Sequence, residues 1–320
     1  CLGGSYLMKA LVTGANGFIG SKLVIALKNI GYELILLSRQ KINNYETVLC
    51  NLGSDEIPEA ALESVDIVFH LAGYTHDLEN SASKNQLYYD VNVKSTIELM
   101  KISASQGVKN FIYLSSVKAG GVSNTNISMS EEDQITPSDI YGSTKRTAEI
   151  EILKIANTNN IAVSIIRPAL VYGDEMKGNL AVMLKSIKRG WFPPLPQTGN
   201  KRSMISIIDV VDAILFISSN QKSSGEIYIA TDGNIYSSRD IYNALCLAAG
   251  KKTPSWEVPQ LFFIVLAAVG DIFRFIPFNS HKYQKLFGDE HYSSEKLNNL
   301  GFTPKYNFSS YLERNNQHTI

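Results

Sequence analysis

Tyr141 and Lys145, four positions apart, are the residues of this chain whose types and spacing are best suited to move a proton. On a helix this spacing places both side chains on one face. A free phenol loses its proton near pH 10, and a neighbouring ammonium lowers that pKa because it stabilises the phenolate. Such a pair could act as general acid and base toward a substrate hydroxyl, although a surface pair without any chemical role has the same spacing.

Ser116 could give this pair a third member. It follows the apolar segment 110–114, which is typical of a buried strand, and it lies 25 positions before Tyr141. A hydroxyl at the carboxyl end of a strand can hydrogen-bond a reacting oxygen beside the tyrosine. Serine also caps helices and forms turns, and the sequence leaves both roles open.

Three glycines, Gly14, Gly17 and Gly20, connect an apolar strand at 9–13 to a helical segment at 19–29. Glycine permits a tight turn and lets the backbone come close to a bound group. The N–H groups at the start of the following helix would face an anion. Glycines at this spacing between a strand and a helix are typical of a loop that binds the pyrophosphate of a dinucleotide.

The end of the second predicted strand, 33–37, indicates which dinucleotide binds. An NAD site usually has an acidic residue there for the ribose hydroxyls. This chain has Ser38, Arg39 and Gln40 instead. A hydroxyl and a guanidinium suit a ribose 2′-phosphate, so the sequence favours NADP over NAD.

The elements that must position these residues alternate between short apolar runs and helical patterns. Near-continuous apolar strands separated by helices are typical of a parallel sheet covered on both faces, the doubly wound α/β fold. In that fold ligands bind at the carboxyl ends of the strands. The predicted strands are 9–13, 33–37, 66–70, 110–114, 162–166 and 226–230, and the predicted helices are 19–29, 141–156 and 207–218.

We expect two parts that interleave along the chain. Residues 8–175 and about 205–232 would form a dinucleotide-binding Rossmann domain. Residues about 176–204 and 233–320 would form a smaller, mostly helical substrate-binding lobe. The Pro-rich segment 191–196 is expected to be a rigid loop of that lobe, because proline fixes φ and lacks an N–H donor.

Together the motifs resemble the extended short-chain dehydrogenase/reductase family, in particular its NAD(P)-dependent nucleotide-sugar epimerase and dehydratase branch, which includes UDP-glucose (galactose) 4-epimerases. The resemblance covers residues 8 to about 175. The matching motifs are Thr-Gly-Ala-Asn-Gly-Phe-Ile-Gly at 13–20, His-Leu-Ala-Gly at 70–73, Asn92, Ser115-Ser116, Tyr141 with Lys145, and Arg167-Pro168.

The resemblance implies a site, residue by residue. Ser116, Tyr141 and Lys145 would be catalytic, and no metal is expected. The residues that would contact the cofactor are Gly14, Asn16, Gly17, Phe18, Ile19, Ser38, Arg39, Asn51, Leu52, Leu71, Ala72, Gly73, Asn92, Ser115, Tyr141, Lys145 and Pro168. The residues that would contact a nucleotide sugar, with a UDP-sugar expected, are Ser116, Lys118, Asn179 and Arg202. An arginine can hold a diphosphate through two parallel hydrogen bonds.

Two reactions remain open for such a site. A 4-epimerase oxidises C4 of a UDP-sugar by transient hydride transfer to the nicotinamide and returns the hydride to the other face of the sugar. An NADPH-dependent 4-ketoreductase of a UDP-4-keto-6-deoxy sugar carries out one half of that reaction. Dehydration is set aside, because Val117 and Lys118 stand where the family's dehydratases have an Asp-Glu pair. The resemblance favours the epimerase.

Two other functions are weighed against these enzymes. A non-catalytic NAD(P)-binding sensor has the same fold, but such relatives typically lack the tyrosine–lysine pair that this chain has. A sterol substrate would suit the apolar segment 262–273, but it has no diphosphate for Arg202 to hold.

Composition narrows the partners and the compartment. Lys plus Arg and Asp plus Glu number 30 each, and this balance argues against a basic nucleic-acid binder and against a polybasic membrane-surface protein. The three cysteines are far apart, which favours the reducing cytoplasm over a disulfide framework. The resemblance suggests a homodimer formed through the helix that carries Tyr141. Residues 1–7 lack the pattern of a signal peptide, and we expect them to be a cloning remnant.

The longest apolar stretch, residues 261–269, is shorter than the ~20 residues that span a bilayer. We therefore expect no transmembrane span. A buried or groove-lining helix is the favoured interpretation, and a monotopic contact with a membrane surface is the weaker alternative.

Overall fold

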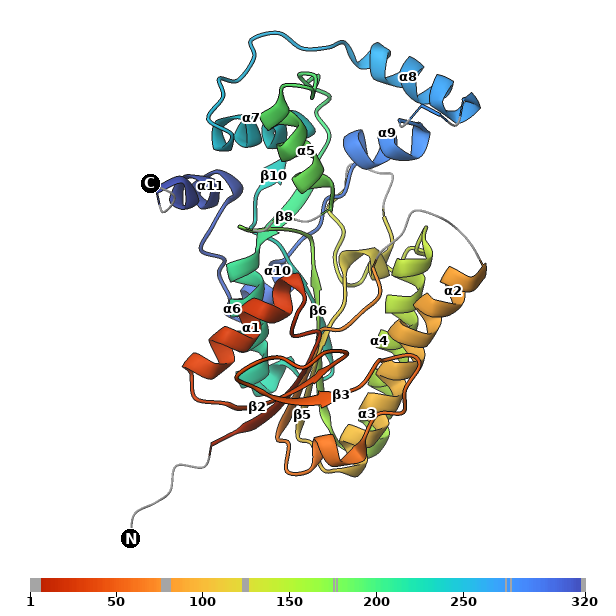
Figure 1. The fold of residues 1–320 in the computed structure, drawn as a ribbon, viewed down its shortest axis with the longest axis vertical. Helices are drawn as coiled ribbons and strands as arrows, with labels where there is room; N and C mark the ends of the chain where they lie inside the picture. The colour runs from red at the N-terminus through yellow and green to blue at the C-terminus, as the bar shows by residue number, and fades with distance from the viewer. Residues whose placement is uncertain are drawn as a thin grey trace.

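The structure, a computed structural model of the 320-residue chain, describes residues 7–75, 82–122, 127–174, 176, 178–273, 275–276 and 278–317. Figure 1 shows a sheet with helices on both faces and a second group of elements beyond one end of the sheet. Apart from its last residue, the expected cloning remnant lies outside the described residues.

Seven parallel strands form the central sheet in the order β3-β2-β1-β4-β5-β6-β9. The direction of chain progress reverses between β1 and β4, and the crevice outside the carboxyl ends of such strands is where doubly wound sheets bind ligands. The predicted doubly wound α/β fold is confirmed. The strands are β1 (Lys9–Thr13), β2 (Glu33–Ser38), β3 (Glu46–Leu49), β4 (Ile67–His70), β5 (Asn110–Leu114), β6 (Ala162–Pro168) and β9 (Glu226–Ala230).

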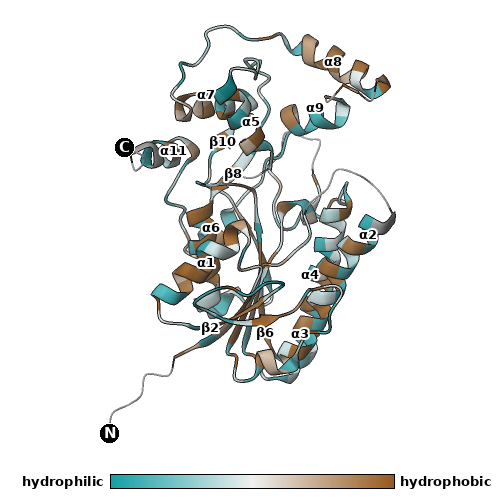
Figure 2. Ribbon diagram, viewed as in Figure 1, coloured by the Kyte–Doolittle hydropathy of each residue, from teal (hydrophilic) through white to brown (hydrophobic). Residues whose placement is uncertain are grey.

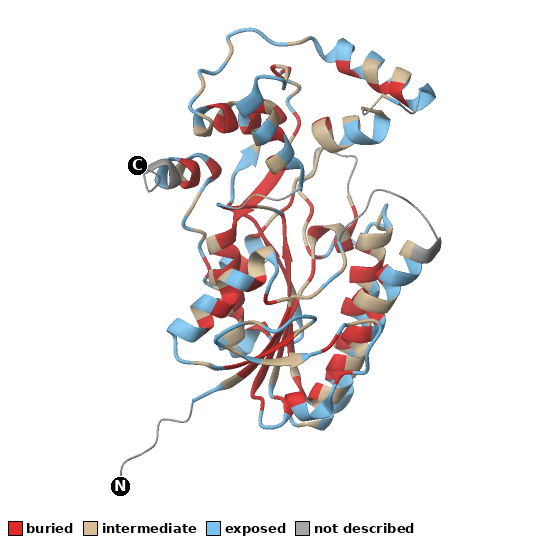
Figure 3. Ribbon diagram, in the orientation of Figure 1, coloured by how far each residue is buried: buried red, intermediate tan, exposed pale blue. Residues whose placement is uncertain are grey.

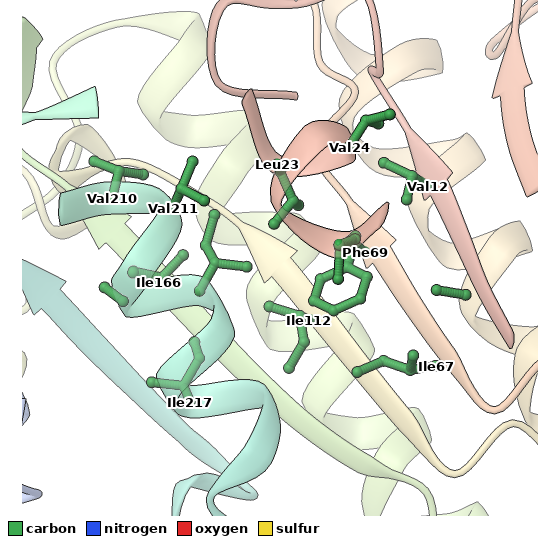
Figure 4. Packing of buried hydrophobic residues seen from close by; sticks show 14 of the residues in the cluster. Val12, Leu23, Val24, Ile67, Phe69, Ile112, Ile166, Val210, Val211 and Ile217 are labelled. Carbon is green, nitrogen blue, oxygen red and sulfur yellow. The ribbon is translucent and has the colours of Figure 1, made fainter. Parts of the chain in front are cut away.

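Two hydrophobic cores lie on opposite faces of this sheet. Side chains alternate between them along each strand, so Ala10 and Val12 pack in one core and Leu11 packs in the other. The first core includes α1 (Phe18–Asn29) and α6 (Ile207–Ser219), and the second includes α3 (Ser95–Ser105) and α4 (Ile140–Asn159). Figure 4 shows the first core, where Leu23 of α1 lies close to Phe69 of the sheet. These helices therefore hold the strand ends in fixed positions.

A second, three-stranded sheet with the order β10-β8-β7 lies beyond the carboxyl ends of the main sheet. Its strands are β7 (Leu170–Tyr172), β8 (Arg202–Ser206) and β10 (Ile235–Tyr236). The Pro-rich segment 191–196 contains neither helix nor strand, as predicted. The division of the chain into two interleaved parts stays a prediction.

The remaining helical segments complete the described chain. The α-helices are α2 (Ala82–Tyr89), α5 (Gly178–Arg189), α7 (Ser238–Ala248), α8 (Gln260–Ile272), α9 (Ser280–Phe287), α10 (Glu295–Asn299) and α11 (Phe308–Gln317). The shorter turns are the 3₁₀ helices η1 (Glu59–Leu62), η3 (Val117–Gly120) and η4 (Gln221–Ser223) and the π-helix η2 (Asp90–Lys94).

Helix α8 differs from the expectation of a buried or groove-lining helix. Phe263 and Ala267 are buried, but Leu261, Phe262 and Val265 are each more than half exposed. Figure 2 shows much of this helix in hydrophobic brown, and Figure 3 shows much of it as exposed. The prediction is therefore wrong for one side of the helix. Within the described ranges, no helix has both the length and the apolar character needed to cross a bilayer.

Candidate active site

The glycine loop packs directly against the chain that follows β4. Gly14 has φ +72°, and a Cβ there would lie 2.7 Å from the amide N of Ala72 and 2.8 Å from the carbonyl C of Leu71. The N–H of Gly17 donates to the carbonyl O of Gly14 at 2.8 Å, and any Cβ at Gly20 would overlap that same oxygen. Glycine is therefore required here for close approach. The loop brings the first turn of α1, whose amides can bind an anion, to the edge where β1 and β4 end.

His70, at the end of β4, links this loop to the neighbouring helical turn. Its Nδ1 lies 2.7 Å from Thr13 Oγ1, and its Nε2 lies 2.8 Å from Thr96 Oγ1. Because the Thr96 hydroxyl donates to the carbonyl O of Asn92, it accepts from Nε2 of the ring. The Thr13 hydroxyl then donates to Nδ1 and accepts from the N–H of Ala72 at 3.0 Å. Burial lowers the pKa of His70 to about 3, so the ring is neutral and its role is to hold the loop.

Asn92 lies in the π-helical turn η2 and joins three segments. Its Oδ1 accepts from the N–H of Tyr74 at 2.7 Å, and its Nδ2 donates to the carbonyl O of Tyr74 and to Thr144 Oγ1, both at 3.1 Å. A Cβ on Gly73 would lie 3.2 Å from Lys145 Nζ and 3.3 Å from Asn92 Oδ1. The segment after β4 therefore meets α4 at this point, and Asn92 holds it there. A direct contact between Asn92 and a cofactor stays a prediction.

Tyr141 lies half-buried in the first turn of α4, and the Ser116 side chain is close enough to its phenol to influence the phenol's pKa. Ser116 also caps η3, where its Oγ accepts from the N–H of Lys118 at 3.3 Å. Burial raises the pKa of Tyr141 to about 12, and the Ser116 side chain acts against that rise. In this structure burial outweighs the favourable interactions, and a lowered pKa with an oxidised nicotinamide bound beside the phenol stays a prediction.

Lys145 is buried one turn after Tyr141 and is held by the end of β5. Its Nζ donates to the carbonyl O of Leu114 at 2.9 Å and lies 4.5 Å from the centre of the Tyr113 ring. Burial lowers the pKa of Lys145 to about 8, and the Glu149 carboxylate acts to raise it. The predicted serine, tyrosine and lysine are thus brought to one place by α4 and the end of β5.

A buried ion pair fixes α4 to β6 behind these residues. Arg167 Nε and Nη2 donate to the two carboxylate oxygens of Glu149 at 2.9 and 2.5 Å, and both side chains are almost fully buried. Such a two-point pair sets the position of the helix as well as its charge. The sequence analysis used Arg167 only as a family motif and did not predict its partner.

The other predicted cofactor residues were examined for their fit to a dinucleotide. Asn16 and Arg39 are exposed. Ser38 is half-buried, and its Oγ accepts from a backbone N–H in the turn after β2 at 3.4 Å. Ser115 Oγ is buried at the end of β5 and has no hydrogen-bond partner within the part of the chain that the structure describes. The Ser115 hydroxyl has an unused hydrogen bond and the glycine turn leaves the amides at the start of α1 without side chains in front of them, so these residues fit a dinucleotide.

The remaining members of the predicted cofactor set have structural neighbours of their own. Phe18 and Ile19 are half-buried at the start of α1, and Leu52 packs against the second core. Pro168 pairs with Ala230 at the carboxyl end of β6. The N–H of Asn51 donates to the Asp55 carboxylate at 2.7 Å. Asp55 therefore places an acid beside Asn51, where related proteins often have an acid that contacts adenine, and the sequence analysis did not name Asp55.

A cavity of about 260 Å³ lies among α5, β8 and α9 and receives three of the four predicted substrate residues, Lys118, Asn179 and Arg202. Glu290, which was not predicted, lies between the two cations. Its Oε1 is 2.5 Å from Lys118 Nζ, and its Oε2 is 3.4 Å from Arg202 Nη2. Burial raises the pKa of Glu290, but the two cations outweigh burial and leave this pKa below its ordinary value. Lys285 of α9 adds a third cation to the wall.

Comparison with known proteins identifies the family. The family model described as the NAD dependent epimerase/dehydratase family matches residues 10–230. The chain belongs to the NAD-dependent epimerase/dehydratase family. The predicted resemblance and the expectation of an enzyme are thereby confirmed.

Individual members of this family show how widely the similarity extends. UDP-glucose 4-epimerase of Vibrio cholerae is 32% identical over 270 residues, which cover 81% of each chain. The protein named N-acetyl-alpha-D-glucosaminyl-diphospho-ditrans,octacis-undecaprenol 4-epimerase, from Escherichia coli O157:H7, is 26% identical over 317 residues, 96% of this chain and 94% of that one. The crystal structure of UDP-glucose 4-epimerase with UDP-glucose from Thermotoga maritima is similar with a TM-score of 0.77 and 21% identity, covering 98% of this chain and 100% of that one. This last likeness supports the fold.

Proposed function

We propose that this family member is a UDP-sugar 4-epimerase that oxidises and re-reduces C4 of its substrate. The observation that carries the proposal is the meeting of Tyr141, Ser116 and Lys145 at the carboxyl edge of the sheet, beside the glycine loop. The Vibrio cholerae relative, named as a UDP-glucose 4-epimerase, supports the same reaction class.

Tyr141 would act as the acid and base at the sugar. As a phenolate, its oxygen would take the proton of the C4 hydroxyl during oxidation, and the resulting phenol would return that proton during reduction. Ser116, whose side chain lies near the phenol, would hydrogen-bond the C4 oxygen beside Tyr141. A bound NAD(P) would supply the hydride acceptor and donor at C4. Because burial raises the pKa of Tyr141 to about 12, added positive charge is needed near the phenol before it can act as a base at neutral pH.

Lys118 and Arg202 would hold the diphosphate of the sugar nucleotide. Both line the cavity, and both are paired with Glu290. Phosphate oxygens would compete with this carboxylate for the two cations, so Glu290 would set how tightly the diphosphate binds. Asn179 of α5 would add an amide to the same wall.

The proposal is tested with UDP-glucose, UDP-galactose and their N-acetylamino analogues, each incubated with the protein and analysed by anion-exchange chromatography. Interconversion of C4 epimers without net change in NAD(P)H absorbance is expected. Stoichiometric NADPH oxidation with a UDP-4-keto-6-deoxy sugar would instead establish the 4-ketoreductase. Nucleotide binding without turnover of any of these sugars would favour the sensor.

The choice of cofactor is a separate proposal. We infer that NADP binds better than NAD, because Ser38 and exposed Arg39 stand at the end of β2, where an NAD site usually has an acid. Replacing Arg39 with Asp should weaken NADPH binding by at least about tenfold and leave NADH binding unchanged or tighter, since one charge-assisted phosphate contact is lost. Fluorescence titration of both nucleotides measures this difference. Equal losses for the two would contradict the proposed phosphate contact.

A second candidate substrate is a diphosphate sugar carried on a polyprenol. The observation that favours it is the exposed apolar side of α8, which packs against α9, while Lys285 and Leu286 of α9 line the cavity. The Escherichia coli relative is named for a substrate of that kind. Turnover of N-acetylglucosaminyl-diphospho-polyprenol in detergent, measured against UDP-N-acetylglucosamine, separates the two substrates.

A further inference from the structure

Large apolar side chains are exposed on α8, in the turn after it and at positions 191 and 256, and Figures 2 and 3 show much of α8 as hydrophobic and as exposed. On α8, Leu261 is 67% exposed, and in the turn after this helix Phe275 is 83% exposed. We call this set the apolar cap, and its members are Trp191, Trp256, Leu261, Phe262, Ile264, Val265, Ile272, Phe273 and Phe275. Soluble monomers rarely expose so many neighbouring apolar groups, so the apolar cap calls for a partner.

Both tryptophans of the chain belong to the apolar cap. Trp191 is 86% exposed and Trp256 is 61% exposed. The two segments that carry them are joined, because the N–H of Val258 donates to the carbonyl O of Pro194 at 3.0 Å. Tryptophan is enriched where protein meets the boundary between lipid and water, since its ring is apolar and its N–H is polar.

The charge around the apolar cap is strongly one-sided. Among the described residues of 178–202 and 249–287, five Lys or Arg (at 185, 188, 189, 252 and 282) and two acids (at 257 and 271) are exposed, whereas the whole chain has 30 of each kind. Lys188, Arg189 and Lys252 are exposed. Cations next to an apolar surface complement the anionic headgroups of a lipid bilayer. This charge distribution favours a membrane over a purely apolar protein partner.

Helix α8 has the geometry of a helix that lies in the plane of a membrane surface. Its 13 residues give a length of about 20 Å at 1.5 Å per residue, which is short of the ~30 Å hydrocarbon core. One side of α8 is anchored, because the Phe263 ring packs against the rings of Phe278 and Phe287, with distances between ring centres of 6.1 and 5.2 Å. The opposite side, with Phe262 and Val265, is free to enter the lipid.

We propose that the apolar cap seats this protein on the surface of an anionic lipid bilayer. Binding would bury the exposed side chains of α8 and the two tryptophans at the level of the headgroups. Helix α9, which packs against α8, also lines the candidate substrate cavity. Substrates carried by the membrane would therefore arrive close to that cavity. The membrane contact itself does not depend on the proposed reaction.

The test is flotation of the whole protein with vesicles of phosphatidylglycerol and phosphatidylethanolamine, compared with vesicles of phosphatidylcholine. We expect binding to the anionic vesicles and at least fivefold weaker binding to the neutral ones. The double variant Phe262→Ser/Val265→Ser should bind the anionic vesicles roughly tenfold more weakly, because two large apolar side chains no longer enter the lipid. The matched control is Ile25→Ser/Ile30→Ser, which removes two exposed apolar side chains from the α1 region and should bind like the parent protein.

Charge is tested separately. Lys188→Glu and Lys252→Glu should each weaken binding to anionic vesicles about fivefold or more, since each basic residue near such a surface contributes on the order of 1 kcal/mol. Both residues are exposed and lie outside the candidate active site. An equal effect of these changes on binding to neutral vesicles would contradict the electrostatic part of the proposal.

A spectroscopic readout uses the two tryptophans. Vesicles with brominated acyl chains should quench the emission of the parent protein, and Trp191→Phe and Trp256→Phe should each remove part of the quenched signal. No flotation and no quenching with folded protein, as judged by circular dichroism, would overturn the proposal. It would also be overturned if ultracentrifugation showed a dimer that Phe262→Ser/Val265→Ser dissociates, because a second copy would then cover the apolar cap. If the parent protein binds vesicles but shows no epimerase activity, the proposed function is rejected and the membrane proposal is not.

Discussion

Burial shifts the pKa values of Tyr141 and Lys145 in opposite directions, to about 12 and about 8. Each shift disfavours the charged form of the side chain. The Ser116 hydroxyl and the Glu149 carboxylate act against the two shifts, so each residue has one neighbour that favours its charge. The site is therefore arranged to keep the phenol protonated until a ligand adds positive charge beside it.

Replacing Tyr141 with Phe removes the proton carrier while it keeps the ring in place. We expect turnover of UDP-sugars to fall by roughly 10²–10⁴, which is the usual contribution of one general acid or base. Cofactor affinity should change less than about threefold, because the glycine loop and the end of β2 are untouched. Steady-state kinetics and nucleotide titration measure the two effects. Full activity of this variant would remove Tyr141 from the proposed mechanism.

The lowered pKa of Lys145 predicts how the free energy of unfolding depends on pH. Its pKa of about 8 in the folded protein lies below the ordinary value of 10.5, so between these pH values the unfolded chain binds more protons. The free energy of unfolding contributed by Lys145 should therefore rise with pH across this window, by about 3 kcal/mol in total. Below pH 8 the burial of its charge destabilises the protein by a constant amount.

The comparison that isolates this effect is the parent protein against Lys145→Met, both unfolded by urea at pH 7.5 and pH 10. The free energy of unfolding of the parent should increase relative to the methionine variant at the higher pH. A difference between the two proteins that does not change with pH would show that Lys145 keeps an ordinary pKa.

At the scale of elements, the strands of the main sheet were predicted where they are buried on both faces. The segment 226–230 reads as an apolar strand and forms β9 with the same bounds. β3 (Glu46–Leu49) was missed, because an edge strand with exposed ends has no continuous apolar pattern. β7 and β10 are only three and two residues long, so they offer no periodicity to detect.

The candidate site was predicted from local motifs, and its long-range partners were not. Lys118, Asn179 and Arg202 each had a motif in the sequence. Glu290 lies in no such motif. It is 172 positions from Lys118 in the sequence, and the two side chains meet because β8 pairs with the chain at Glu290. The apolar side of α8 was assigned to the interior because apolar residues surround the helix, and only the packing shows which side is covered.

Gly20 gives a prediction at the scale of the β1–α1 unit. In an exposed helix, Gly→Ala stabilises by roughly 0.5–1 kcal/mol. Here a Cβ would overlap the carbonyl O of Gly14, which also accepts from Gly17, so α1 would have to move away from the loop. We expect Gly20→Ala to destabilise the protein by about 2 kcal/mol or more and to weaken nucleotide binding.

Thermal unfolding with and without NADPH measures both effects. The control is Ser21→Ala, on the exposed side of the same turn. Its free energy of unfolding should lie within about 0.5 kcal/mol of that of the parent protein.

At the scale of the whole molecule, two different groups of elements carry exposed apolar side chains. The apolar cap lies beyond α5 and α7, whereas α2, α3 and α4 form a layer on one face of the main sheet (Figure 1). Exposed apolar side chains also occur in this layer, at Ile150 of α4 and at Leu87 and Tyr89 of α2. The predicted homodimer through α4 and the proposed membrane contact therefore use separate surfaces and can coexist.

The homodimer is tested by placing a charge in that layer. Ile150 is 46% exposed on α4, one position after the buried Glu149, so a change there reaches the helix surface without altering the ion pair to Arg167. We expect sedimentation of the parent protein as a dimer and a shift of Ile150→Glu toward monomer, because an unpaired carboxylate in an interface is desolvated without compensation. Ile25→Glu, on α1 at the other face of the sheet, should leave the dimer intact. A parent protein that sediments as a monomer at tens of micromolar would contradict the predicted homodimer through α4.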